Sequence, residues 1–183
     1  MPTIAAVILA GGKSSRMGQD KSQLMLGNRT LLAHTKELLL AAGNTEIVIS
    51  GALGIKDKQT NKGPLSGLFS CLEELRHYNY LFFVPVDMPL LSTDIIKQLL
   101  QEIDQETVHQ LFHFNNHRLP LILQNTPEIR LVIEKQLHSD DLSLHQLFKH
   151  LKTKTLKHNF ESECFFNANS PEQWQSVLDK LKL

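Results

Sequence analysis

The stretch that decides the fold lies near the start of the chain, where Ile4-Ala-Ala-Val-Ile-Leu9 is followed by Ala10-Gly-Gly-Lys-Ser-Ser-Arg-Met-Gly-Gln-Asp-Lys21. The first six residues are a continuous apolar run, which is typical of a strand covered on both faces. The segment after it is rich in small residues and carries three cations. Glycine lets the backbone approach a ligand closely, and Lys and Arg attract a polyanion. The pattern predicts a loop that holds a phosphate chain against backbone N–H groups.

Two common phosphate-binding loops do not fit this spacing. A Walker A loop needs a glycine five positions before its Gly-Lys-Ser, and that position here is Val7, inside the predicted strand. A dinucleotide-binding loop needs the pattern G-x-G-x-x-G, whereas Gly11 and Gly12 are adjacent and the next glycine is Gly18. Neither type of loop is therefore present here.

The composition predicts an ordinary globular protein. The chain has 183 residues, which predicts a single domain over residues 1–183 with one substantial core. It carries 19 basic and 19 acidic residues, so no net field attracts nucleic acid or an anionic membrane, and neither is expected as a partner. No run approaches the ~18 apolar residues of a membrane span, and no basic residue precedes the first apolar stretch. We expect a cytoplasmic protein whose two cysteines are free thiols.

Strand and helix patterns alternate along the chain. In the first half, strands are predicted over Ile4–Leu9, Glu46–Ser50 and Tyr80–Val86, and helices over Thr30–Ala42, Gly63–Tyr78 and Ser92–Ile103. In the second half, strands are predicted over Val108–Phe114, Leu119–Leu123, Thr153–Leu156 and Cys164–Phe166, and helices over Pro127–Leu137, Leu142–Leu151 and Ser170–Leu181. This order predicts an α/β fold with a mostly parallel sheet and helices on both faces.

Three polar features follow predicted strands: the glycine loop, Ser50-Gly51 and Asp87. Ligands of open parallel sheets bind at the carboxyl ends of the strands, so these features indicate one site. Asp87 lies between Pro85 and Pro89, which hold it rigidly. Its carboxylate is either a Mg²⁺ ligand or a cap of the following turn, and the neighbouring glycine loop favours the metal.

Charged residues of the loop and the histidines remain to be assigned. Arg16 and Lys21 are the stronger candidates for phosphate binding, while Lys13 fits a solvated surface cation equally well. Asp20 either orients Lys21 or caps a turn, and the cap is favoured. The histidines at 109, 113 and 117 recur every four residues, but apolar neighbours typical of a strand surround them and no carboxylate completes a metal site.

The loop resembles the signature of nucleotidyltransferases with a Rossmann-like fold, and in particular that of the molybdenum cofactor guanylyltransferase family, which joins GMP to molybdopterin. Three further motifs match in the same order: Gly63-Pro-Leu-Ser-Gly67, Val84-Pro-Val-Asp-Met-Pro89 and Phe166-Asn-Ala-Asn-Ser-Pro-Glu172. Arg118-Leu-Pro-Leu121 also resembles the substrate loop of that family. The resemblance covers essentially the whole chain, and it implies a three-layer Rossmann-like nucleotidyltransferase fold.

The resemblance also implies a chemistry and a set of residues. The enzyme would use GTP and Mg²⁺, accept molybdopterin as second substrate, release pyrophosphate, and contact molybdoenzymes or molybdopterin-loading proteins transiently. Catalytic roles fall to Lys21, Arg16 and Asp87, with Asp87 as the metal ligand. The implied nucleotide-binding residues are Leu9, Ala10, Gly11, Gly12, Lys21, Ser50, Asp57 and Asp87, and those of the cofactor side are Asn167, Asn169 and Arg118.

Alternatives remain open at this point. The family often has Asn where this chain has Ser50-Gly51, although Leu-Ala-Gly-Gly favours guanine over the Leu-Ala-Ala-Gly of relatives that use CTP. A CTP- or sugar-phosphate-specific nucleotidyltransferase of the same fold is one alternative. A non-catalytic relative that carries the cofactor is another. The attacking phosphate is already an anion, so catalysis by positioning and charge neutralisation needs no nucleophile–base pair.

Overall fold

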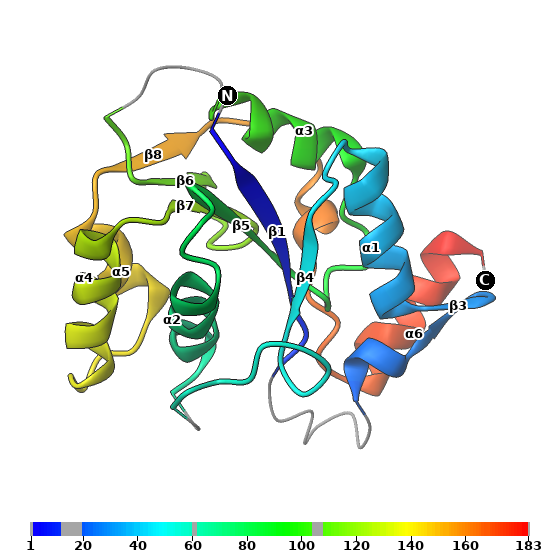
Figure 1. Ribbon diagram of the computed structural model, residues 1–183. Coiled ribbons are helices and arrows are strands. Elements are labelled where there is room, and N and C mark those ends of the chain that lie inside the picture. Colours follow the sequence, from blue (N-terminus) through cyan, green and yellow to red (C-terminus); the bar gives the residue numbers. More distant parts are fainter. Residues whose placement is uncertain (1, 12–19, 60–61, 104–107, 183) are drawn as a thin grey trace.

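The computed structural model describes residues 2–11, 20–59, 62–103 and 108–182. They form a six-stranded sheet in the order β4-β1-β5-β7-β6-β8, with helices on both faces (Figure 1). The strands are β1 (Ile4–Leu9), β4 (Ile47–Ser50), β5 (Tyr80–Pro85), β6 (Leu111–Phe114), β7 (Leu121–Gln124) and β8 (Thr153–Leu156). β1 pairs in parallel with β4 and β5, and β6 pairs in parallel with β8. The predicted α/β fold with a mostly parallel sheet is confirmed.

β7 is antiparallel to both of its neighbours, β5 and β6. The connection between Phe114 and Leu121 is too short for the crossover that a parallel pair requires. β6 therefore runs in the same direction as β1 and β5, and its carboxyl end lies at the same edge of the sheet as theirs.

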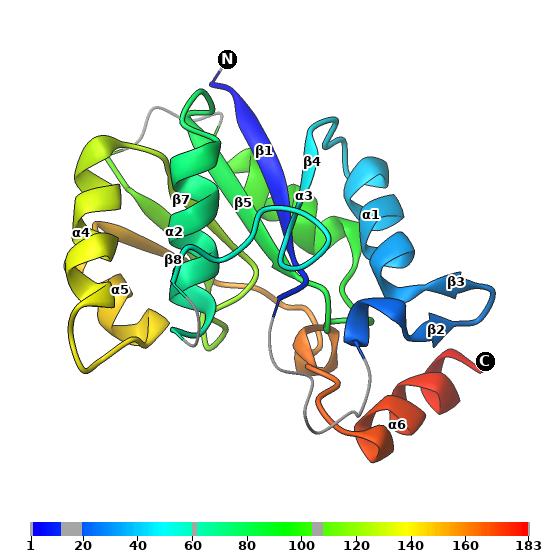
Figure 2. The same ribbon diagram turned by 60° about the horizontal axis from the view of Figure 1, so that its bottom comes forward.

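Two hydrophobic cores lie on opposite faces of the sheet. Ala6 and Ile8 of β1 face one core, which α1 (Leu31–Ala41), α3 (Thr93–Gln101) and α6 (Pro171–Leu181) complete. Ala5 and Val7 face the other core, which α2 (Pro64–Glu74), α4 (Pro127–Leu137) and α5 (Leu144–His150) complete. Figure 2 shows these two helical layers from a second direction. Burial on both faces explains why β1 is a continuous apolar run rather than an alternating one.

Side-chain caps set where several helices begin. The hydroxyl of Ser92 accepts a hydrogen bond from the Ile95 N–H, which confirms the predicted N-cap of α3. Four further helices begin after equivalent hydroxyl caps, at Thr30, Thr126, Ser143 and Ser170. Such a cap stabilises a helix by about 0.5–2 kcal/mol. Within the described ranges, none of the helices combines the length and the apolar character needed to cross a bilayer.

Two short segments differ from the prediction. Residues 164–166 were expected to form a strand, but Ser162–Phe165 forms a 3-10 helix, η2. The chain turns there toward β5, and the Ala168 N–H donates to the Asp87 carbonyl instead of entering a sheet ladder. A small hairpin of β2 (Met25–Leu26) and β3 (Arg29–Thr30) was not predicted, because each strand has only two residues. Its turn uses Gly27 at a φ of 65°.

Candidate functional site

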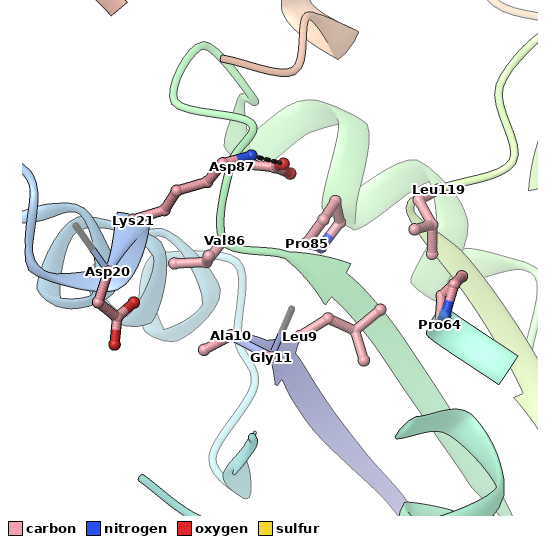
Figure 3. Close-up of a pocket in the computed structure, with 10 residues that line it drawn as sticks. All are labelled: Leu9, Ala10, Gly11, Asp20, Lys21, Pro64, Pro85, Val86, Asp87 and Leu119. Atoms are coloured by element: carbon pink, nitrogen blue, oxygen red, sulfur yellow. Dashed lines mark hydrogen bonds and ion pairs between the residues drawn. The ribbon is translucent and has the colours of Figure 1, made fainter. Parts of the chain in front are cut away.

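A pocket of about 210 Å³ lies beyond the carboxyl ends of β1 and β5 (Figure 3). This is the edge at which open parallel sheets bind their ligands. Its lining comes from the glycine loop, η1 (Lys21–Gln23), the start of α2, the end of β5 and the β6–β7 loop. The lining residues are Leu9, Ala10, Gly11, Asp20, Lys21, Pro64, Pro85, Val86, Asp87 and Leu119. The structure thus brings together five of the predicted site residues, which are Leu9, Ala10, Gly11, Lys21 and Asp87.

The charged centre of the pocket is Lys21. Its Nζ atom donates to Oδ2 of Asp87 at 2.9 Å and to Oδ1 of Asn169 at 2.5 Å. Figure 3 shows the Lys21 side chain reaching across to Asp87. The two charged side chains expose only 16% and 21% of their surface, so water screens their attraction less than on an open surface. Three segments that are far apart in the sequence therefore meet at one ammonium group.

Lys21 is held in place by its own short helix. Oδ1 of Asp20 accepts the Ser22 N–H at 2.9 Å and caps η1, which confirms the predicted cap. In Figure 3 the Asp20 carboxylate points away from the contact between Lys21 and Asp87. The Lys21 carbonyl accepts the Leu24 N–H, which closes the turn. Asp20 therefore orients the backbone of Lys21 and does not pair with its ammonium group.

Asp87 is fixed from both sides of the sheet edge. The Val86 N–H donates to the Leu9 carbonyl at 3.1 Å, which joins the end of β5 to the start of the glycine loop. The Ala168 N–H donates to the Asp87 carbonyl at 2.9 Å. The Asp87 carboxylate is thereby placed between the glycine loop and the segment that carries Asn169.

Ser50 and Gly51 support the glycine loop through their backbone. The Ala10 N–H donates to the Ser50 carbonyl at 2.9 Å. Gly51 has a φ of +123°, and a Cβ atom there would lie 2.8 Å from the Gly11 nitrogen. The Ser50 side chain is buried toward α2, where it hydrogen-bonds Cys71. This bond opposes the effect of burial, which raises the pKa of the Cys71 thiol to about 11.

Asp57 lies beside α2, outside the lining of the pocket. A Cβ atom placed on Gly67 would lie 3.5 Å from Asp57 Oδ1, 3.3 Å from Ser50 Oγ and 3.9 Å from Leu9 Cδ2. Gly67 therefore lies close to the Asp57 carboxylate, the Ser50 hydroxyl and the Leu9 side chain. Burial raises the pKa of Asp57. No other residue in the described part of the chain hydrogen-bonds its carboxylate.

The remaining predicted residues lie around the same edge or outside the described ranges. Asn167 is exposed, and its carbonyl accepts a 3.4 Å hydrogen bond from Asn169 Nδ2. Arg118 is exposed next to Leu119, which lines the pocket. Gly12 and Arg16, like Lys13, lie outside the described residues. Five lining residues were not predicted as part of the site, although all lie within the quoted motifs: Asp20, Pro64, Pro85, Val86 and Leu119.

The two oxygen atoms that accept hydrogen bonds from Lys21 are of the kind that binds a hard cation. Asp87 Oδ2 and Asn169 Oδ1 converge on one positive group, so their positions suit a cation. Mg²⁺ takes one or two carboxylates and completes its shell with substrate phosphates and water. Within the described ranges, no cluster of three or more His, Cys, Asp or Glu side chains could hold a metal alone. A divalent cation at Asp87 would therefore take its further ligands from Asn169, substrate phosphates and water.

Comparison with known proteins finds nucleotidyltransferases that are related to this chain over nearly its whole length. Residues 6–154 match the family model described as a MobA-like NTP transferase domain. A molybdenum cofactor guanylyltransferase from Xanthomonas euvesicatoria pv. vesicatoria is 37% identical over 182 residues, covering 94% of this chain and 93% of that protein. A protein of the same name from Shewanella halifaxensis is 28% identical, covering 95% and 93%.

Solved structures share the fold. The molybdopterin-guanine dinucleotide biosynthesis protein A of Archaeoglobus fulgidus superimposes with a TM-score of 0.76 at 16% identity, over 97% of this chain and 98% of that chain. The 2-C-methyl-D-erythritol 4-phosphate cytidylyltransferase of Thermus thermophilus reaches 0.70 at 14% identity, over 100% of both chains. At these identities the likeness describes the architecture and does not separate one base from another. The family model and the 37% identical relative decide the assignment, and the chain belongs to the MobA-like NTP transferase family.

Proposed function

We propose that this chain transfers GMP from GTP to the terminal phosphate of the molybdenum-molybdopterin cofactor, giving molybdopterin guanine dinucleotide and pyrophosphate. One observation carries the proposal: Lys21 Nζ is held between Asp87 and Asn169 beside the glycine loop. The names of the relatives support the same substrates. Residues 1–183 act as one nucleotidyltransferase domain in this proposal.

The reaction needs positioning and charge neutralisation. A phosphate oxygen of molybdopterin forms a bond with the α-phosphorus of GTP. The bond from that phosphorus to the β-bridging oxygen breaks, and pyrophosphate leaves with the electron pair. The backbone of Leu9–Gly12 holds the triphosphate, while Lys21 and Arg16 offset its negative charge. Asp87 would hold a Mg²⁺ ion, which would supply further charge neutralisation on the phosphate oxygens.

The acceptor binds on the side formed by the β6–β7 loop and the segment before α6. Arg118 offers a guanidinium group that matches a phosphate with two parallel donors. Asn167 and Asn169 offer amide groups for the polar atoms of the pterin. Asn169 contacts Lys21, and Leu119, next to Arg118, lines the pocket, so in this proposal the two substrates meet at Lys21 and Asp87.

Pyrophosphate release tests the function. With Mg²⁺ and molybdopterin, we expect release with GTP and little or none with CTP, UTP or ATP. Omitting molybdopterin should stop the release, because the acceptor supplies the nucleophile. A preference for CTP would replace the guanine assignment by the cytidylyltransferase alternative. Binding of molybdopterin without turnover of any nucleotide would favour a carrier role.

Base selection gives a prediction for Asp57. A carboxylate can accept both the N1–H and the amino group of guanine, which adenine and the pyrimidines do not offer together. Asp57→Asn replaces one acceptor by a donor. Since a hydrogen bond to a charged group contributes about 1.5–3 kcal/mol, GTP affinity should fall about 10- to 100-fold. Calorimetric titration of GTP and ATP measures this, with Asp140→Asn, an exposed acid, as control.

The same carboxylate predicts a pH dependence. Only ionised Asp57 accepts both guanine donors, so GTP binding weakens as the pH falls through the pKa of this group. Because burial raises this pKa above its ordinary value, the loss begins at a higher pH than for an ordinary aspartate. In Asp57→Asn, the affinity for GTP should no longer fall with pH through this group. A profile that is unchanged by the substitution would exclude Asp57 from the base site.

Gly51→Ala is expected to weaken GTP binding at least ~10-fold while the protein stays folded. The added Cβ atom would lie 2.8 Å from the Gly11 nitrogen and 2.9 Å from its Cα atom, so the glycine loop must move. Positive φ itself costs a non-glycine residue about 1–2 kcal/mol. Gly43→Ala is the matched control, since Gly43 has a φ of +97° and no atom within 4 Å of the new Cβ. Equal GTP affinity in both variants, measured beside their thermal unfolding, would contradict this role.

A further inference from the structure

A cluster of aromatic and histidine rings lies at the same edge of the sheet as the pocket. Its members are Phe114, His117, His158, Phe160 and Phe165. His117 and Phe165 are stacked, with ring centroids 3.8 Å apart and an interplanar angle of 13°. The ring of His158 lies 5.4 Å from that of His117 and 5.0 Å from that of Phe165. The cluster joins the β6–β7 loop, the segment after β8, and η2.

The histidine side of the stack is fixed by β6. Nδ1 of His113 lies 2.8 Å from the carbonyl oxygens of Phe114 and His117. Both partners are acceptors, so Nδ1 donates to them, and Nε2 lies 3.1 Å from the Thr155 hydroxyl. The His117 N–H also donates to the Phe114 carbonyl at 3.1 Å. The backbone of the loop is thereby held so that the imidazole of His117 lies against Phe165.

The phenylalanine side of the stack leads directly into the pocket. Phe165 is 4% exposed, so its ring is enclosed by the surrounding side chains. Three residues later, the Ala168 N–H donates to the Asp87 carbonyl. The next residue, Asn169, accepts the hydrogen bond from Lys21. Because these contacts lie on one short segment, a displacement of the Phe165 ring would move the groups that meet Asp87 and Lys21.

We propose that His117 is a positioning residue, whose ring stacks on Phe165 and thereby sets the place of the segment Asn167–Asn169. It acts through Phe165 and contacts neither substrate. The part of the inference that concerns the acceptor rests on the proposed function, since that segment forms the molybdopterin side of the site. The stack itself rests on the geometry alone.

The protonation state of His117 agrees with this role. Burial lowers the pKa of His117, and the neighbouring imidazoles of His158 and His113 lower it further. The ring is therefore mainly neutral at pH 7 and stacks as an uncharged aromatic surface. An uncharged phenyl ring should replace it, whereas an aliphatic side chain should not.

Hydrogen exchange tests the stack without any substrate. Amide exchange is followed in the full chain for wild type, His117→Ala, His117→Phe and His117→Leu. In His117→Ala the Ala168 amide should exchange about 3- to 10-fold faster, the loss expected for one aromatic pair. His117→Phe should restore protection and His117→Leu should not. His145→Ala, on the exposed face of α5, should match wild type.

Steady-state kinetics gives the functional readout. His117→Ala should raise the KM for molybdopterin about 3- to 10-fold and change the Kd for GTP less, because Asn167 and Asn169 of the displaced segment form the acceptor side of the proposed site. Unchanged protection of the Ala168 amide in His117→Ala would overturn the inference. Equal protection in His117→Leu and His117→Phe would also overturn it, because general packing and not ring stacking would then hold the segment. If His117→Ala fails to fold, the comparison of Phe with Leu decides. If wild type makes no product from molybdopterin, the proposed function fails while the exchange result still tests the stack.

Discussion

Asp87→Asn is expected to lower kcat/KM for GMP transfer at least ~100-fold in a protein that remains folded. The loss corresponds to the removal of one preorganised charged group from the reaction centre. Asparagine preserves the shape of the side chain and can still accept the Lys21 hydrogen bond through Oδ1. The hydrogen bond from Ala168 reaches the backbone carbonyl of Asp87 and is retained. The substitution therefore removes the negative charge and little else, and steady-state pyrophosphate release measures its effect.

Two further measurements separate a metal-binding role from a structural one. If Asp87 binds the divalent cation, Asp87→Asn should need a higher Mg²⁺ concentration for half-maximal rate. In EDTA the variant should bind GTP at least as tightly as wild type, because a carboxylate that repels the triphosphate is gone and the charge of Lys21 is no longer offset by it. Near-normal turnover at ordinary Mg²⁺ would remove Asp87 from the metal site. Asp94→Asn, at the exposed start of α3, controls for the loss of one acidic residue.

The sequence predicts the fold well where burial dictates the residue pattern. β1 and β5 are covered on both faces, so each is a continuous apolar run, and α3 begins at the predicted hydroxyl cap Ser92. Prediction fails where tertiary contacts override the local pattern. Cys164–Phe166 was expected to be a strand, but Phe165 turns inward to meet His117, and the segment forms η2. No local pattern contains that information, because the partner ring lies on another loop.

Part of the candidate site can likewise be predicted from the sequence, and part of it depends on contacts between distant segments. Strand ends locate the glycine loop and Asp87, since the carboxyl ends of parallel strands meet at one edge. The contact between Lys21 and Asn169 joins residues 148 positions apart, which no periodicity can predict. Asn169 was predicted as a site residue only from the family resemblance. The spacing of His109, His113 and His117 did not indicate a stacking role, because the position of His117 against Phe165 depends on contacts between separate loops.

Lys21→Ala is expected to reduce kcat/KM at least ~100-fold, because it removes the cation that offsets charge on the leaving pyrophosphate. It also leaves Asp87 and Asn169 without their shared donor in a partly buried site. We expect a cost on the order of 1–3 kcal/mol in the free energy of unfolding. Lys21→Arg keeps the charge but places a planar guanidinium where two oxygens meet a compact ammonium, so it should restore stability more than turnover. Lys36→Ala, on the exposed face of α1, is the matched control.

A double-mutant cycle decides whether Lys21 acts on the substrate or only holds Asp87. If it served only to orient the carboxylate, Lys21→Ala would add nothing to Asp87→Asn, and GTP affinity in EDTA would be the same in both backgrounds. If the ammonium contacts the triphosphate, Lys21→Ala should weaken metal-free GTP binding in the Asp87→Asn background as well. Residues that share an ion pair couple in such a cycle, so non-additive unfolding energies are expected in either case. The contact of Lys21 with the triphosphate is therefore measured by the loss of GTP affinity that Lys21→Ala causes in the Asp87→Asn background.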